Sequence, residues 1–172
     1  YSHSISNVFM YNCTITENTN TSGAYGNSSY VVYGMDYTRF NLNNTLIADN
    51  IGGAILAQNN GLQYSYTELN GVTVTNNVSE DGASSGIKIT SPTPDGYTNI
   101  SNSNIYGNGD STQIFIDADV NPTLNIEYSN IQNGLDLVDD GVGVINWGDG
   151  NIDVDPRFVS VIEGEEDYHL LA

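Results

Sequence analysis

The stretch YNCTITEN, residues 11–18, decides the fold because close variants of it return four more times along the chain. Repeats of 26 to 32 residues that are rich in Gly and Asn and lack a helical period are typical of solenoid proteins. Alignment of the five copies on one aliphatic position gives Ile15, Ile47, Val74, Ile105 and Ile131.

The positions around this aliphatic residue are also chemically alike in all copies. An apolar residue stands five positions before it, a small residue two positions before it, and Asn three positions after it, replaced by Gly134 in the last copy. The apolar set is Met10, Leu42, Leu69, Ile100 and Ile126. The small set is Cys13, Thr45, Val72, Ser103 and Ser129, and the Asn set is Asn18, Asn50, Asn77 and Asn108. A third strand-like run follows at residues 31–32, 54–56, 87–89 and 114–116. Each repeat therefore predicts three short strands.

This pattern predicts an all-β fold, a single-stranded parallel β-helix (β-solenoid) of about five to six coils. In such a coil each strand pairs in register with its equivalent one coil away, at roughly 4.8 Å, so like residues stack on like. Alternate side chains of a strand point to opposite faces, so Cys13 and Ile15 are expected inside while Thr14 and Thr16 face outward.

The repeated Asn stands where the second strand is expected to end and the chain to turn. Asn tolerates the left-handed backbone region and bonds to neighbouring backbone groups, which suits a corner. We also expect the stacked amides to bond along the axis of the coil, each bond contributing about 0.5 to 1.5 kcal/mol.

The charge of the chain limits its partners. Three Lys and Arg against 21 Asp and Glu give a net charge of -18, which excludes a basic surface for nucleic acid. Fourteen of the acidic residues lie at or after Asp110. Such an excess of acidic residues indicates high solubility, binding of divalent cations or a saline medium. The alternative is that the acidic side chains only solvate the surface. No stretch has the roughly 20 apolar residues of a membrane helix, so direct membrane insertion is not expected.

Tyrosines are concentrated near the corner that follows the third strand, in the segments 33–39, 57–66 and 90–97. Because successive coils superpose their corners, the rings should gather along one edge. Aromatic rings beside short polar side chains suit the binding of a glycan. The alternative is that the rings only cover strand ends. The predicted ligand-binding residues are Tyr33, Tyr37, Tyr64, Tyr66 and Tyr97.

The repeats resemble those of secreted right-handed parallel β-helix proteins, in which a phrase of the form Asn-Ser-Thr-Ile-x-x-Asn recurs before a Gly-rich turn and a third strand. The resemblance covers residues 8–134. The tail GNIDVDPRFV at residues 150–159, followed by DYHLLA, resembles the segment that closes the helix in large extracellular bacterial proteins. The resemblance implies a right-handed coil, a secreted or cell-surface location, and a non-catalytic surface protein of which this chain is a fragment. It supplies no activity.

Pectate lyases and polygalacturonases share this architecture, so polysaccharide lyase or hydrolase chemistry was tested against the residues. A lyase needs a clustered cation and base, and a hydrolase needs paired carboxylates facing a cleft. The chain offers three weak candidates, Asp139, Asp140 and Lys88. Its two histidines stand at opposite termini, and no nucleophile elbow is present.

Calcium is a possible cofactor because oxygen-bearing side chains alternate near the C-terminus. The four candidate ligands are Asp149, Asn151, Asp153 and Asp155. The pattern imitates a calcium loop in part, since Val154 and Ser160 replace the Gly and Glu that an EF-hand loop requires. The same alternation is also typical of a solvated strand.

These observations lead to one leading hypothesis and two alternatives. Residues 1–134 form the coils and residues 135–172 form the last coil and a closing segment, with Trp147, Phe158, Tyr168 and Leu170 plugging the open end. The leading hypothesis is an extracellular structural or adhesive module with a glycan as its partner. The alternatives are a subunit that associates end to end through an uncovered first coil, and a polysaccharide-processing enzyme.

Overall fold

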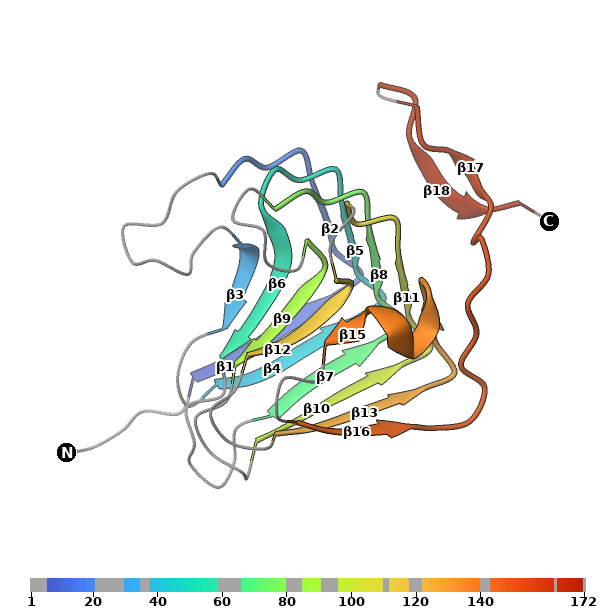
Figure 1. Ribbon diagram of the computed structural model, residues 1–172. Helices are drawn as coiled ribbons and strands as arrows, with labels where there is room; N and C mark the ends of the chain where they lie inside the picture. The colour runs from blue at the N-terminus through green and yellow to red at the C-terminus, as the bar shows by residue number, and fades with distance from the viewer. Residues whose placement is uncertain are drawn as a thin grey trace.

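The computed structural model describes residues 6–20, 30–34, 38–58, 66–79, 85–90, 96–109, 112–117, 122–139, 143–162 and 164–171. These residues form a parallel β-helix in which three sheets surround a common interior (Figure 1). The first sheet contains β1 (Ser6–Tyr11), β4 (Thr38–Asn43), β7 (Tyr66–Asn70), β10 (Tyr97–Ser101), β13 (Thr123–Glu127) and β16 (Val144–Trp147). The second contains β2 (Thr14–Thr16), β5 (Leu46–Ala48), β8 (Thr73–Thr75), β11 (Asn104–Tyr106) and β14 (Asn130–Ile131).

The third sheet contains β3 (Tyr30–Gly34), β6 (Gly53–Gln58), β9 (Ile87–Thr90), β12 (Ile114–Asp117) and β15 (Val138–Asp139). A single 3-10 turn, η1 (Gly134–Leu137), precedes β15. The hairpin of β17 (Phe158–Ser160) and β18 (Asp167–Leu170) is antiparallel and lies outside the coils (Figure 1). The described residues contain no helix that is long and apolar enough to cross a membrane.

The predicted stacking of equivalent residues is confirmed. Ile15 pairs with Ile47, and the same register continues through Val74 and Ile105 to Ile131. The apolar column of the first sheet is equally continuous, from Met10 through Leu42, Leu69 and Ile100 to Ile126. The repeat period of the sequence is therefore the period of the coil.

The two inward columns and the third sheet together form one hydrophobic core. In the second to fourth coils Leu42, Ile47, Val74 and Ile105 are almost completely buried. Full burial of such a side chain contributes roughly 1.5 to 3 kcal/mol, so these columns are the main stabilising element. In the first coil the equivalent Met10 and Ile15 are only partly buried, as are Ile145 and Trp147 in the last coil.

The predicted Asn column forms a ladder of side-chain hydrogen bonds, here called the asparagine ladder, which is buried from Asn50 onward. The Nδ2 of Asn18 donates to Oδ1 of Asn50 at 3.0 Å, that of Asn50 to Asn77 at 2.7 Å, and that of Asn77 to Asn108 at 2.9 Å. The same Asn77 amide also donates to the Ile47 carbonyl oxygen at 3.0 Å and the Thr75 carbonyl oxygen at 2.9 Å. The ladder thus ties neighbouring coils together and satisfies backbone groups inside the corner.

The expected left-handed conformation occurs at a different position from the one predicted. The residue before each ladder Asn has a positive φ: 58° at Glu17, 57° at Asp49, 53° at Asn76 and 75° at Gly107. The ladder Asn itself has no positive φ in the described coils. The chain makes its sharp turn one residue earlier, and this turn directs the Asn side chain into the corner, where its amide bonds to the next coil.

The four bulky residues that were expected to plug the open end of the coil lie in two different places. Of the bulky residues predicted to do so, Trp147 packs against the core at the end of the first sheet. Phe158, Tyr168 and Leu170 instead line a groove between the hairpin and the outer face of the second sheet. The hairpin therefore lies along the side of the coils, with its Phe158 and Tyr168 rings 5.2 Å apart in an edge-to-face contact.

One hydrogen bond joins the hairpin to the second coil across 119 residues of sequence. The Tyr168 hydroxyl donates to Oδ1 of Asp49 at 2.5 Å, and Nδ2 of Asn76 donates to the same oxygen at 2.5 Å. Burial of the phenol, and after it the hydrogen bond to Asp49, raise the pKa of Tyr168 far above its ordinary value. The neutral phenol is the form that holds the hairpin against the coils.

We predict that Asn77→Ala lowers the free energy of unfolding by about 2 to 4 kcal/mol, because it leaves buried polar groups without partners. Asn146→Ala serves as the control, since the exposed Asn146 donates one hydrogen bond to Asn125 on the outer surface. The control should lose less than about 0.5 kcal/mol. Urea unfolding followed by circular dichroism measures both, and equal losses would contradict the structural role of the ladder.

We also predict that Tyr168 ionises well above pH 10.0, the ordinary tyrosine value, and that Asp49→Asn moves its titration to lower pH. Since the folded-state pKa lies above the unfolded one, this contribution to stability is complete below about pH 10 and is lost as the pH rises further. NMR titration of ring-labelled tyrosine measures the shift. Titration of wild-type Tyr168 at the value of free tyrosine would exclude the buried contact with Asp49.

Candidate functional site

The outer face of the first sheet carries the most regular polar surface among the described residues. On β7, Thr67 and Leu69 point inward and are buried, whereas Tyr66, Glu68 and Asn70 face outward. This alternation follows from the two-residue period of a strand. Because the strands pair in register, outward residues of successive coils stand side by side in rows.

The first of these rows, here called the tyrosine row, consists of Arg39, Tyr66 and Tyr97, which are register partners on β4, β7 and β10. The rings of Tyr66 and Tyr97 are stacked, with centroids 5.6 Å apart and planes inclined by 7°. The guanidinium carbon of Arg39 lies 5.8 Å from the centre of the Tyr66 ring, within reach of a cation–π contact. Burial and the nearby Glu68 carboxylate raise the pKa of Tyr97.

The second row, here called the amide row, consists of Glu68, Asn99, Asn125 and Asn146. Nδ2 of Asn99 donates to Oε1 of Glu68 at 2.9 Å, that of Asn125 to Oδ1 of Asn99 at 2.6 Å, and that of Asn146 to Asn125 at 2.7 Å. Burial raises the pKa of Glu68 and the Asn99 hydrogen bond opposes this shift. An amide has two N–H donors and two acceptor lone pairs, so these bonds leave each group capacity for a ligand.

The two rows border shallow hollows on the sheet. One hollow is lined by Tyr66, Tyr97 and Glu68, and its neighbour by Glu68, Asn99 and Asn125. Glu68 belongs to both, so a ligand that fills them would cross the sheet at this carboxylate. Aromatic rings, amides and one carboxylate on an open sheet can bind a polar ligand by stacking and hydrogen bonding.

The structure brings together two of the five tyrosines that the sequence singled out. Tyr66 and Tyr97 lie next to each other at the start of their strands rather than in loops. Tyr33 lies on β3 in the third sheet, where its hydroxyl donates to Oε1 of Gln58 at 3.0 Å. Tyr37 and Tyr64 lie outside the described residues. A role of these residues in ligand binding stays a prediction.

Sequence reasoning missed the amide row. Its members stand immediately before the aligned apolar column: Glu68 before Leu69, Asn99 before Ile100, and Asn125 before Ile126. The signal was therefore present in the repeat alignment. It lay in an outward column, where side chains are not constrained by burial as those of the inward columns are.

Of the three candidate catalytic residues the structure describes two, Lys88 and Asp139, and it places them on strands that are not neighbours. Lys88 is buried on β9, with its Nζ 5.4 Å from the centre of the Phe115 ring. Phe115 pairs with Lys88 on one side and with Asp139 on the other, so a strand separates the two candidates. Asp140 lies outside the described residues.

The four candidate calcium ligands lie in the segment that follows β16. The Asn151 side chain is engaged within the coil: its Oδ1 accepts the Ser129 backbone N–H at 3.0 Å, and its Nδ2 donates to the Ile126 carbonyl oxygen at 2.8 Å. Asp155 accepts the Arg157 backbone N–H at 2.8 Å, while Asp149 and Asp153 are exposed. The described residues contain no group of three or more His, Cys, Asp or Glu side chains placed to hold a metal ion. Calcium binding here stays a prediction.

Comparison of the chain with protein-family models, with curated proteins and with solved structures gave no match. The function therefore has to be inferred from the chemistry of the surfaces described above.

Proposed function

We propose that this chain is an extracellular structural and adhesive module that binds a neutral glycan on the outer face of its first sheet. The observation that carries the proposal is the stacked pair of Tyr66 and Tyr97 beside the amide row. Sugar rings have apolar C–H faces and a rim of hydroxyl groups. They are recognised by an aromatic ring together with amide and carboxylate groups at its side.

The register of the sheet supports a specific position for the sugar ring. One face of Tyr66 is shared with Arg39 and the other with Tyr97. The partner of Tyr97 in the next coil is Thr123, a much smaller side chain. The proposed position of a sugar ring is against Tyr97 on the side of Thr123, where Asn99 and Asn125 stand in the adjacent row.

The charge of the chain supports a neutral rather than an acidic glycan. The net charge is -18, and the first sheet itself presents Glu68 and Glu127. A uronate or sulfated polymer would be repelled by this surface. Within the described residues of this sheet Arg39 is the one cation, and it already lies over the Tyr66 ring.

The architecture supports a spacer or adhesive role. Each coil bonds to its neighbours through backbone pairing on three sheets and through the asparagine ladder. Such an array presents side chains at fixed spacing along its length. The extracellular location rests on the resemblance of the repeats and of the GNIDVDPRFV segment to secreted β-helix proteins.

We predict that Tyr97→Ala weakens binding to a neutral glycan at least about tenfold, which corresponds to ~1.4 kcal/mol. Tyr11→Ala is the matched control, since Tyr11 is exposed on β1 of the same sheet but outside the two rows. It should change affinity less than about twofold. A glycan array selects the ligand and calorimetry measures the variants. Equal losses in both variants, or an array on which no neutral glycan binds, would show that the proposal is wrong.

A second candidate function is end-to-end association of copies of this chain. The partial burial of Val8, Met10 and Ile15 supports it, because the equivalent residues of the next coil, Phe40, Leu42 and Ile47, are almost completely buried. The strands β1, β2 and β3 each pair on one side only within the described residues. A coil of a second copy, added in the same register, would cover both the apolar side chains and the open edges.

This second candidate predicts that the sedimentation coefficient of the wild type rises with protein concentration and that Met10→Lys abolishes the rise. A lysine at this inward edge position would place a charge in the contact. Circular dichroism controls for folding of the variant. A wild type that remains monomeric at all concentrations would exclude end-to-end association and leave the glycan proposal untouched.

A further inference from the structure

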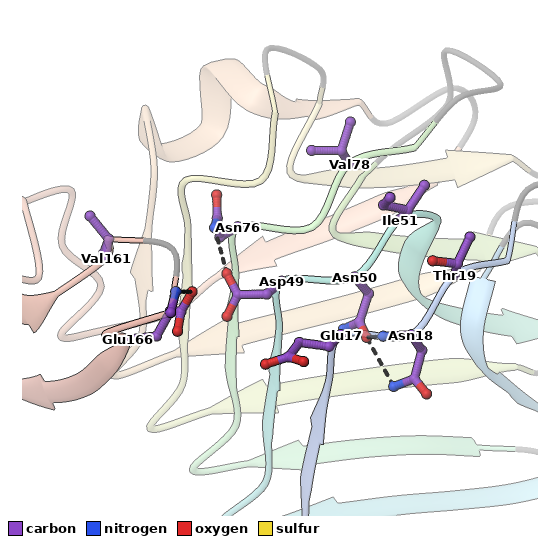
Figure 2. Close-up of a pocket in the computed structure, with 11 residues that line it drawn as sticks. Glu17, Asn18, Thr19, Asp49, Asn50, Ile51, Asn76, Val78, Val161 and Glu166 are labelled. Carbon is purple, nitrogen blue, oxygen red and sulfur yellow. Dashed lines mark hydrogen bonds between the residues drawn. The ribbon is translucent and has the colours of Figure 1, made fainter.

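A cleft separates the C-terminal hairpin from the corner that follows the second sheet (Figure 2). Its volume is about 550 Å³. The coil wall carries Glu17, Asp49, Ile51 and Val78, and the hairpin wall carries Val161 and Glu166. This cleft shares no lining residue with the glycan surface proposed above.

The two walls are held at this separation by specific contacts. The Tyr168 hydroxyl bonds to Asp49, and Asn76 donates to the same carboxylate oxygen. On the hairpin, the Gly164 backbone N–H donates to Oε1 of Glu166 at 2.7 Å. Asp49 and Glu166 are carboxylates of the coil wall and of the hairpin wall, respectively (Figure 2). The cleft is therefore bounded by a hairpin whose position is fixed by specific hydrogen bonds.

The cleft exposes aliphatic side chains on both walls. Ile51 is 45% exposed, Val78 is 50% exposed and Val161 is 56% exposed. Ile51 and Val78 are register partners in neighbouring coils, so they form a continuous apolar strip next to the buried Asn50 and Asn77. Exposed aliphatic side chains that lie together on a polar protein mark a surface suited to contact with another molecule.

Three carboxylates line the same cleft as this apolar strip. Glu17, Asp49 and Glu166 line the cleft, and its described lining contains no Lys or Arg. An occupant must therefore combine positive charge with apolar surface. Lysine and arginine side chains have both, because an aliphatic stem carries the charged group. A small cation would satisfy the carboxylates and leave the aliphatic strip uncovered.

On the hairpin side the cleft is lined by Val161, Gly164 and Glu166, which lie in the turn between β17 and β18. Carboxylates and aliphatic side chains in one cleft fit a peptide segment that carries both basic and aliphatic side chains. We propose that the cleft docks a segment of a partner protein in which lysine or arginine alternates with aliphatic residues.

The probe is a fluorescein-labelled synthetic octapeptide of alternating Lys and Val, titrated with the full chain at about 0.15 M salt and followed by anisotropy. The proposal expects saturable binding that is weakened at least about fivefold by Glu17→Gln with Glu166→Gln, and likewise by Ile51→Ser with Val78→Ser. The matched control is Glu127→Gln with Asp153→Asn, which changes the net charge equally at exposed positions away from the cleft. It should alter affinity less than about twofold.

Three outcomes would overturn the proposal. Equal weakening by the control pair would show diffuse attraction to the acidic chain. Equal affinity for an alternating Lys-Ser peptide, with no effect of the Ile51 and Val78 substitutions, would identify a site for cations alone. Absence of any anisotropy change would show that the cleft binds no such segment. Since Glu166 is partly buried and the other substituted side chains are exposed, circular dichroism should show all variants folded as the wild type.

Discussion

Parallel pairing of each coil with the next, in exact superposition of equivalent residues, is the constraint on which the rest of this structure depends. The spacing between equivalent positions varies from 26 to 32 residues, yet the paired residues never leave their columns. The variation is taken up at the corners. The asparagine ladder makes this possible, because its amides bond both to the next coil and to backbone groups of the turn.

The same superposition creates the outer surfaces. A strand that buries Leu69 must present Glu68 and Asn70 on its other face, and the next coil repeats this arrangement one strand away. Tyr66 therefore meets Tyr97, and Glu68 meets Asn99. Rows of like groups on the exterior are thus a direct consequence of a periodic core, and the proposed glycan surface needs no further element to position it.

The C-terminal hairpin is not part of this periodic arrangement. Its strands are antiparallel, it lies outside the coils, and its link to them runs from Tyr168 to Asp49, 119 residues earlier in the chain. Nothing in the repeat specifies this contact. The docked hairpin adds a second surface that differs chemically from the aromatic and amide face of the first sheet. This second surface is an acidic cleft with exposed aliphatic residues beside the second sheet.

The repeat alignment also shows where prediction from sequence succeeds and where it ends. The columns of Ile47 and Leu42 were predictable because burial requires the same kind of side chain at the same place in every coil. The left-handed residue was misplaced by one position, because Glu17, Asp49 and Asn76 share a backbone conformation and little chemistry. The tyrosines were assigned to loops, although Tyr66 and Tyr97 begin strands.

The sequence by itself determined the coil, its three strands per turn and its interior columns, since these depend on local periodicity that each repeat restates. Only the tertiary structure decided which outward side chains meet, where the tail docks, and that a cleft opens beneath it. These features arise from single contacts between residues far apart in the chain, such as Tyr168 with Asp49. A contact that occurs once leaves no period in the sequence, so no repeated pattern of residues predicts it.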